Sequence, residues 1–425
     1  MGIASKSSPI PQRERLAWGI LIGSFVVCLT LTVAVPVSVS AFIQNAKQLL
    51  PATVQANQGS VRVSSSVLRR VVLAGEAELA VEPSTRIQTD DGGTANLFIT
   101  PPDNSRLLAR LQIYTNTSVW LEEASTPRFG VSDAGQAVAL DLQNGRLRLT
   151  LPEFQQRPLI FSITTPQSLV QINTPGTYSI EANDSETQLT VQSGAAQIQS
   201  QEHILDLKPQ QRAVVINDAP PSGPLTPEQN LIENGDFSAG LDNWAAFAWN
   251  LELKDQPSGE TQVSTRDGEE VLSFTRTGVG HADVRIQQSI NKDVADFTSV
   301  RLLLTFRILQ QELSVCGFKG SECPLFVRLN YTDEEGVSRI WQQGFYGFGT
   351  VDDSTAPGAC LSCAVIQSSH LQTTLGQLYV YDVDIAQELA RQGFLPPRTI
   401  ESVTIVGSGH SFATEVLEAA LIAEE

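Results

Sequence analysis

The stretch NTPGTYSIEANDSETQLTVQSGAAQIQS, residues 173–200, decides the fold class of the middle of the chain. Apolar and polar residues alternate along it, and turn residues interrupt the alternation at Pro175-Gly176 and Ser193-Gly194. Alternation with a period of two sends successive side chains to opposite faces of a strand. A shared core is therefore predicted for Tyr178, Ile180, Leu189 and Val191. The stretch is therefore predicted to form part of a β-sheet.

The same pattern extends outward from this stretch, from Gly59 to about Ile216. Short alternating runs are separated by turn signals at Asp91-Gly92-Gly93, Pro101-Pro102-Asp103 and Asn144-Gly145. An Asn-Gly pair between two alternating runs predicts a β-hairpin. Because no helical period of useful length occurs here, this part of the chain is predicted to be an all-β unit.

An apolar segment lies near the N-terminus, where no charged residue occurs from Leu16 to Ala46. About 20 apolar residues suffice to cross a bilayer as a helix. Trp18 lies near one end of the segment, and basic residues precede it, which predicts a cytoplasmic tail. We expect a tail over 1–15, a transmembrane helix over 16–43 and a connector over 44–56, with the bulk of the chain outside.

A cleaved signal peptide is the alternative, because the residues VSVSA ending at Ala41 could form a cleavage site. The apolar run is longer than the usual 7–15-residue core of such a peptide, which favours an uncleaved anchor.

The overall charge restricts the class of partner. The formal net charge is −18, with 28 basic and 46 acidic residues, and no basic cluster stands out. This balance argues against nucleic acid, which requires clustered Lys and Arg. An acidic surface also repels anionic lipid headgroups, so the helix is the expected membrane contact.

The order of the β segments carries a family resemblance. The matching pieces are GSVRV (59–63), STRIQTDDGGTANLFI (84–99), LDLQNGRLRLTL (140–151), FSITTPQSLVQINTPGTYSI (161–180), TQLTVQSGAAQI (187–198) and LKPQQRAVVI (207–216). The most specific positions are Thr165-Pro166, Gly176-Thr177-Tyr178, Gly194 and Gln210-Gln211, the last in place of a more usual Gly-Gln. This order resembles the extracytoplasmic domain of FecR-type proteins, the ferric-citrate regulator family, over residues 57–217.

The resemblance implies an elongated, solenoid-like stack of short strands outside the membrane. Typical members also carry a cytoplasmic domain that holds a sigma factor. The tail expected here has only about 15 residues, too few to fold. Sigma-factor regulation is therefore not expected.

A second domain follows a proline-rich linker over 218–230. The residues NLIENGDFSAGLDNWAAFAW, at 230–249, resemble the opening of carbohydrate-binding modules and galactose-binding-like jelly rolls. Further alternating segments suit a sandwich of about eight strands, in which the last strand pairs beside the first. We expect a jelly roll over 231–425, which makes the fold all-β apart from the membrane helix.

Four cysteines fall in this second domain: Cys316, Cys323, Cys360 and Cys363. An even number outside the membrane predicts two disulfides in one of three pairings, and tetrahedral zinc is the alternative. Cys28 lies in the predicted membrane helix. The four histidines, at 203, 281, 370 and 410, include no pair with metal-ligand spacing.

The second domain is also rich in aromatic residues: Trp244, Trp249, Tyr331, Trp341, Phe345, Tyr346, Tyr379 and Tyr381. Aromatic rings either fill a sandwich core or stack on the C–H faces of sugars. Core is the more common role, but Trp341, Phe345 and Tyr346 lie in the glycine-rich WQQGFYGFG and are candidates for a ligand-binding loop. His410, beside a glycine-rich turn, is a further candidate to line a pocket.

The carboxylates of the second domain favour a structural metal site over a catalytic site. Related jelly rolls often bind a structural Ca²⁺ through oxygen ligands where the first and last strands meet. Glu233, Asp236 and Glu418 are the candidate ligands. Asp382 and Asp384 share one face of a predicted strand, but no glycosidase motif surrounds them, and we expect neither catalysis nor a required cofactor.

Taken together, these patterns predict a single-pass membrane protein that displays a binding or sensing module outside the cell membrane. A glycan or a cell-envelope polymer is the favoured ligand of the jelly roll. The alternative is a structural or assembly scaffold that binds other envelope proteins.

Overall fold

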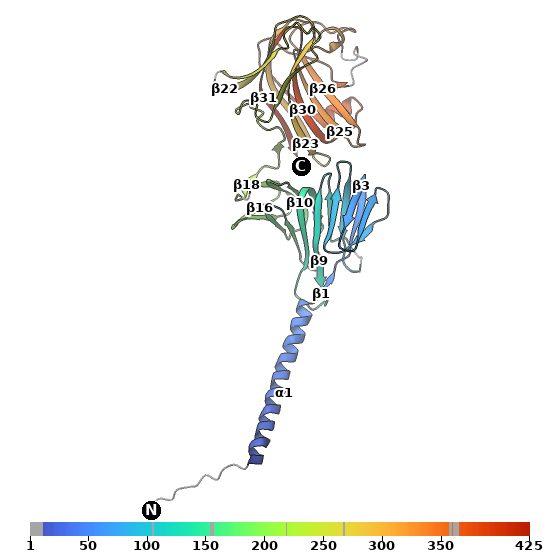
Figure 1. The fold of residues 1–425 in the computed structure, drawn as a ribbon, viewed down its shortest axis with the longest axis vertical. Helices are drawn as coiled ribbons and strands as arrows, with labels where there is room; N and C mark the ends of the chain where they lie inside the picture. Colours follow the sequence, from blue (N-terminus) through green and yellow to red (C-terminus); the bar gives the residue numbers. More distant parts are fainter. Residues whose placement is uncertain are drawn as a thin grey trace, which may run out of the picture. The chain divides into compact units, whose positions relative to one another are not determined.

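The computed structural model describes residues 12–103, 106–153, 157–217, 219–266, 268–356, 359 and 365–425. The chain divides into two compact units, the first formed by Met1–Pro209 with Ala213–Gly223 and the second by Gln210–Arg212 with Pro224–Glu425. Figure 1 shows the strands of both units and the single long helix. The boundary at 223/224 lies inside the predicted linker.

Helix α1 (Gln12–Asn45) covers the predicted transmembrane segment. Its stretch from Leu16 to Asn45 is long and apolar enough to cross a membrane once. The hydroxyl groups of Thr30 and Thr32 donate to carbonyl oxygens four residues earlier, at 2.8 and 2.7 Å. These bonds satisfy the polar side chains within the helix itself, as a lipid environment requires.

The first unit is built from two sheets. Its strands are β1 (Lys47–Leu49), β2 (Ala52–Gln58), β3 (Ser60–Ser64), β4 (Arg69–Leu73), β5 (Leu79–Val81), β6 (Thr85–Thr89), β7 (Thr94–Ile99), β8 (Ala109–Ile113), β9 (Ser118–Pro127), β10 (Gln136–Leu151), β11 (Leu159–Thr164), β12 (Leu169–Ile172), β13 (Gly176–Ala182), β14 (Glu186–Ser193), β15 (Ala196–Ser200), β16 (His203–Leu207), β17 (Gln211–Ile216) and β18 (Ser222–Leu225). One sheet has the order β4-β3-β6-β9-β10-β11-β12-β15-β16, with β1 added to β9. The other has the order β5-β2-β7-β8-β10-β13-β14-β17.

Strand β10 belongs to both sheets, which corrects the predicted hairpin at Asn144-Gly145. The strand passes through this pair without turning back. Asn144 pairs with β9 in the first sheet, whereas Gly145 pairs with Ala182 of β13 in the second. Gly145 adopts a φ of 97°, and a Cβ there would collide with Thr117. The Asn-Gly pair therefore marks the residue at which β10 changes sheets.

The predicted connector over 44–56 is also part of the fold. Strand β1 lies within it and β2 begins in it, and Ala52, Val54 and Ala56 are buried in the core. The alternation of apolar and polar residues in ATVQA, at 52–56, is the sequence feature that indicates a strand here. The core predicted for the opening stretch is confirmed: Tyr178, Ile180, Leu189 and Val191 are all fully buried in one cluster.

The second unit is a sandwich of a six-stranded and a seven-stranded sheet. Its strands are β19 (Gln229–Asn230), β20 (Ala245–Trp249), β21 (Glu260–Arg266), β22 (Glu269–Arg276), β23 (Ala282–Asp293), β24 (Ser299–Gln311), β25 (Leu325–Asp333), β26 (Ser338–Tyr346), β27 (Ile366–Gln367), β28 (Leu371–Gln372), β29 (Tyr379–Asp384), β30 (Pro397–Gly409) and β31 (Phe412–Glu424), with helix α2 (Ile385–Arg391) after β29. The strand orders are β21-β22-β31-β24-β29, with β19 on β31, and β20-β23-β30-β25-β26-β27, with β28 on β26.

Among the described residues, this sandwich has more strands than the eight or so expected, and three of them, β19, β27 and β28, contain only two residues. Its first strand, β19, pairs antiparallel with its last, β31, as the resemblance implied. A single hydrophobic cluster fills the space between the sheets.

Candidate ligand-binding face

Two of the aromatic residues predicted to bind ligand lie in the core instead. Trp341 and Phe345 are both fully buried, and Trp341 Nε1 donates to Ser368 Oγ at 2.9 Å. The Phe345 ring packs against Phe306, with ring centroids 4.6 Å apart. The prediction of a sugar-stacking loop is wrong for both, because the glycine-rich stretch forms strand β26 and sends these side chains between the sheets.

The other predicted ligand residues lie outside that core. Tyr346 is 5% exposed and packs beside the cysteines. His410 follows the end of β30, and its Nε2 lies 4.0 Å from Glu322 Oε1. Neither side chain forms a row with Trp341 or Phe345.

Exposed aromatic rings occur on strand β20, at the end of its sheet. Phe247 is 37% exposed and Trp249 is 62% exposed. They are two residues apart in a strand, so both side chains lie on the same face. The alternation in AAFAW was visible in the sequence, but nothing there distinguished Trp249 from the aromatic residues of the core.

Arg285 connects the two rings. It pairs with Phe247 across strands β20 and β23. Its guanidinium carbon lies 4.9 Å from the Phe247 centroid and 5.2 Å from that of Trp249. Burial lowers the pKa of the Arg285 guanidinium, and the charge of Asp283 opposes this shift. Its Nε is buried without a hydrogen-bond partner among the described residues.

A row of polar side chains continues from these rings across the same sheet. Val284, Ile286, Val327, Leu329, Val403 and Ile405 point into the core. Alternation therefore places their neighbours on the opposite face. We define the polar face as Phe247, Trp249, Asp283, Arg285, Gln287, Arg328, Gln342, Thr404 and Ser408. Arg328 Nε donates to Gln342 Oε1 on this face, and the buried Ser408 hydroxyl lies beside the Asp283 carboxylate.

A pocket of about 450 Å³ lies beside the first residue of β20 and the second half of β23. It is lined by Leu231, Glu233, Asn243, Trp244, Ala245, Gln287, Gln288, Ser289 and Ile290. Gln287 belongs both to this pocket and to the polar face. The face therefore combines exposed aromatic rings, hydrogen-bonding groups and a pocket at one end.

The predicted calcium ligands are not gathered into a site. Glu233 lines the pocket, and its Oε2 accepts a hydrogen bond from Asn243 at 2.8 Å. Asp236 accepts hydrogen bonds from Ser238 in its own turn, while Glu418 is exposed on β31. Among the described residues, the one group of three metal-ligating side chains within 4.8 Å is Cys316, Cys323 and His370.

The cysteine prediction is resolved in part. Cys316 and Cys323 form a disulfide, with Cα atoms 4.1 Å apart, and both are fully buried. Cys360 and Cys363 lie outside the described residues. Cys28 is an exposed free cysteine on α1.

The two aspartates considered for catalysis have structural contacts. Asp382 pairs with Arg301. Asp384 caps α2 by accepting from the backbone N–H of Gln387 at 2.9 Å.

His281 contacts both the polar face, through Asp283, and the segment Cys316–Cys323 that carries the disulfide (the disulfide segment), through Glu322. Its Nδ1 lies 2.9 Å from Glu322 Oε1, and its Nε2 lies 3.3 Å from Asp283 Oδ1. Burial disfavours the charged imidazole, but hydrogen bonds and charges from Asp283 and Glu322 outweigh it and raise the pKa of His281 to about 9. At neutral pH this histidine is therefore a cation between two carboxylates.

We expect the protonated His281 to make stability depend on pH. Because its pKa rises on folding from 6.5 to about 9, its contribution is full below pH 6.5 and is lost as the pH rises through 9. The loss should be on the order of 1–3 kcal/mol. Urea unfolding of the wild type and of His281→Gln across this range measures the difference. A wild-type curve parallel to that of the variant would contradict the expectation.

Comparisons with known proteins match parts of the chain. Residues 86–197 match the family model described as FecR protein. The sequence matches no curated protein. A proposed anti-sigma factor from Parabacteroides distasonis is 16% identical and has a TM-score of 0.25; the match covers 38% of this chain and 66% of that one. This chain thus spans just under two thirds of that structure.

Carbohydrate-binding modules are also similar to this chain. The family 11 module of Clostridium thermocellum, solved with a β-1,3-1,4-mixed-linked tetrasaccharide, is 11% identical with a TM-score of 0.27; the match covers 46% of this chain and 94% of that one. The xylan-binding domain from Paenibacillus barcinonensis is 8% identical with a TM-score of 0.25; the match covers 46% of this chain and 96% of that one.

Proposed function

We propose that this chain is a membrane-anchored binding protein whose polar face holds a glycan or a cell-envelope polymer. Helix α1 anchors it, with the short basic tail in the cytoplasm and both β units outside. The FecR-like unit acts as a spacer or as a sensor, and the jelly-roll unit binds the ligand. No catalysis is required for this role.

The observation that carries the proposal is the arrangement of Phe247 and Trp249 around Arg285. The C–H face of a pyranose is apolar and can stack on an exposed aromatic ring. Sugar hydroxyls need donors and acceptors, and the half-buried polar side chains of Arg285 and Gln287 lie beside the rings. Few precisely placed polar groups beside an apolar surface are typical of a small-molecule or saccharide site.

Replacing Trp249 with alanine tests this role. We expect the variant to bind its polymer at least about tenfold more weakly, which corresponds to roughly 1.4 kcal/mol of lost stacking. Full-length protein in detergent micelles would be assayed against a panel of soluble polysaccharides and purified peptidoglycan. Val380→Ala is the matched control, because Val380 is an exposed apolar residue on β29 of the other sheet.

Two outcomes would contradict glycan binding. One is that the wild type retains no polymer of the panel. The other is that Trp249→Ala and Val380→Ala bind equally well, which would place the ligand away from the polar face.

A protein-binding scaffold is the second candidate. Strand β4 lies at the end of the strand order of its sheet, and Val67, Val71 and Leu73 on or beside it are exposed. An apolar strand at a sheet edge is a typical surface for pairing with another chain. Crosslinking in the native envelope that is lost in Val71→Lys would favour this role.

A further inference from the structure

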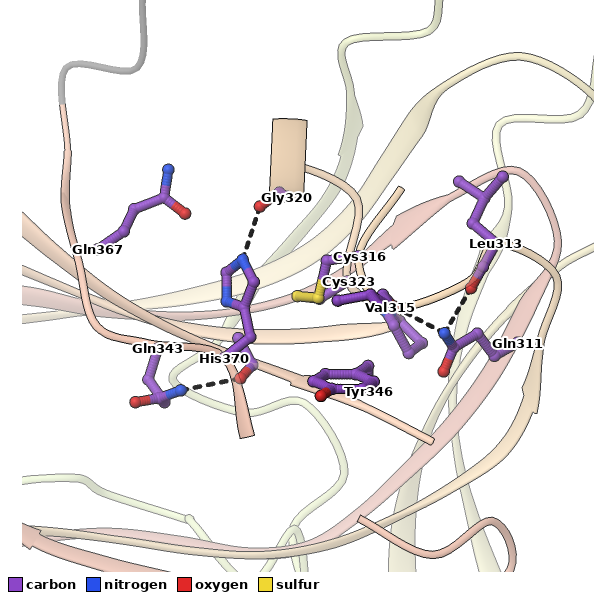
Figure 2. The surroundings of a disulfide bond; sticks show 12 residues. Gln311, Leu313, Val315, Cys316, Gly320, Cys323, Gln343, Tyr346, Gln367 and His370 are labelled. Carbon is purple, nitrogen blue, oxygen red and sulfur yellow. Dashed lines mark hydrogen bonds between the residues drawn. A yellow bond between two sulfur atoms is a disulfide. The ribbon is translucent and has the colours of Figure 1, made fainter. Parts of the chain in front are cut away.

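A side chain of a metal-ligating type, which the linear sequence did not connect to the cysteines, lies beside the disulfide. His370 lies between β27 and β28, far along the chain from Cys316 and Cys323. One ligand atom from each of these three residues lies within 4.8 Å of the other two. Figure 2 shows the His370 ring beside the disulfide.

The hydrogen bonds of His370 define its tautomer. Its Nε2 lies 2.8 Å from the carbonyl oxygen of Gly320, drawn as a dashed line in Figure 2. A carbonyl oxygen can only accept, so Nε2 carries the proton and Nδ1 has the free lone pair. His370 is 8% exposed, and its Nδ1 is buried without a hydrogen-bond partner among the described residues. A buried acceptor left in this way is unfavourable unless something occupies it.

Gly344 of strand β26 allows Cys323 and His370 to approach the backbone closely. A Cβ at this position would overlap both the Sγ of Cys323 and the Nδ1 of His370, the latter at 2.5 Å. Without a side chain at Gly344, a sulfur and an unprotonated ring nitrogen can both lie close against the backbone of β26. Sulfur and imidazole nitrogen are the ligand types that Zn²⁺ prefers.

The surroundings of the three residues suit a metal ion. The cysteines pack in a buried apolar cluster with Val315, Phe326, Tyr346 and Val406. Such a shell restricts water and strengthens the attraction between thiolates and a cation. The bond from Nε2 to a backbone carbonyl is also the usual outer contact of a metal-bound histidine, because it orients the ring.

We propose that Cys316, Cys323 and His370 form a redox-controlled site for a thiophilic divalent cation of the Zn²⁺ type. In the oxidised chain the disulfide occupies both sulfurs and the site is closed. A dithiol reductant transfers two electrons and two protons to the sulfur–sulfur bond, giving two thiols and its own cyclic disulfide. Zn²⁺ then displaces the two thiol protons and binds both thiolates and the Nδ1 of His370.

The test measures zinc alone on the full chain in detergent micelles. Cys28, Cys360 and Cys363 are replaced by serine, so that Cys316 and Cys323 are the remaining thiols. We expect about one tightly held Zn²⁺ per reduced chain and none on the oxidised chain. Substituted Co²⁺ should show thiolate charge-transfer absorption.

His370→Gln should weaken zinc binding by at least about tenfold. His203→Gln, which changes an exposed histidine of the other unit, should leave it unchanged. Equal zinc affinity in the two variants would overturn the site. So would equal binding by the oxidised and reduced chains.

Folding is followed in the same samples by near-ultraviolet circular dichroism. Zinc that binds the folded form should raise the melting temperature of the reduced chain. If the reduced chain loses its tertiary signal and zinc does not restore it, the proposal fails.

Discussion

Trp341→Ala should destabilise the jelly-roll unit by about 3–5 kcal/mol, the usual cost of truncating a large aromatic residue in a core. The side chain is fully buried, so its removal leaves a cavity between the sheets. It also removes the hydrogen bond from Trp341 Nε1 to Ser368 Oγ. Scanning calorimetry of the full chain should show a lower melting temperature for this unit.

Trp249→Ala is the matched control for this experiment. Trp249 is a tryptophan of the same unit but is 62% exposed, so its loss should change stability by less than about 1 kcal/mol. The two tryptophans thus separate stability from binding. A Trp341→Ala variant as stable as Trp249→Ala would show that Trp341 does not lie in the core.

Gly145→Val should destabilise the first unit by roughly 2–4 kcal/mol. The backbone of Gly145 has a φ of 97°, which a β-branched residue adopts only with strain. A side chain there would also collide with Thr117. Because β10 changes sheets at this residue, the strain affects the pairing of both sheets.

Gly130→Val is the control for this change. Gly130 lies in a loop of the same unit, and no heavy atom lies within 4 Å of a Cβ built there. Unfolding followed by circular dichroism should therefore separate the two variants. Equal stabilities would mean that β10 can change sheets without glycine.

The pattern of the residues was sufficient for the fold class and the main core. Alternation in the opening stretch placed Tyr178, Ile180, Leu189 and Val191 inside, and all four are buried. The uncharged run from Leu16 to Ala46 was sufficient to predict a helix that is long and apolar enough to cross a membrane. These features depend on local periodicity and on length, which a single sequence states directly.

One local signal was compatible with two structures, and the hairpin that the sequence predicted at Asn144-Gly145 was wrong. Asn144-Gly145 has the chemistry of a hairpin turn, because both residues tolerate positive φ. In the structure the same freedom allows β10 to bend from one sheet to the other. The choice depends on whether distant strands, β8 and β13, are available to pair with its second half.

The candidate sites were decided by tertiary structure. Trp341 and Trp249 have the same side chain, but Trp341 points between the sheets from β26, whereas Trp249 lies on the outer face of the edge strand β20. His370 lies beside the cysteines only because tertiary packing brings the chain after β27 next to the residues that carry the disulfide. Periodicity tells which side of a strand a residue occupies, whereas strand order and long-range packing decide what faces that side.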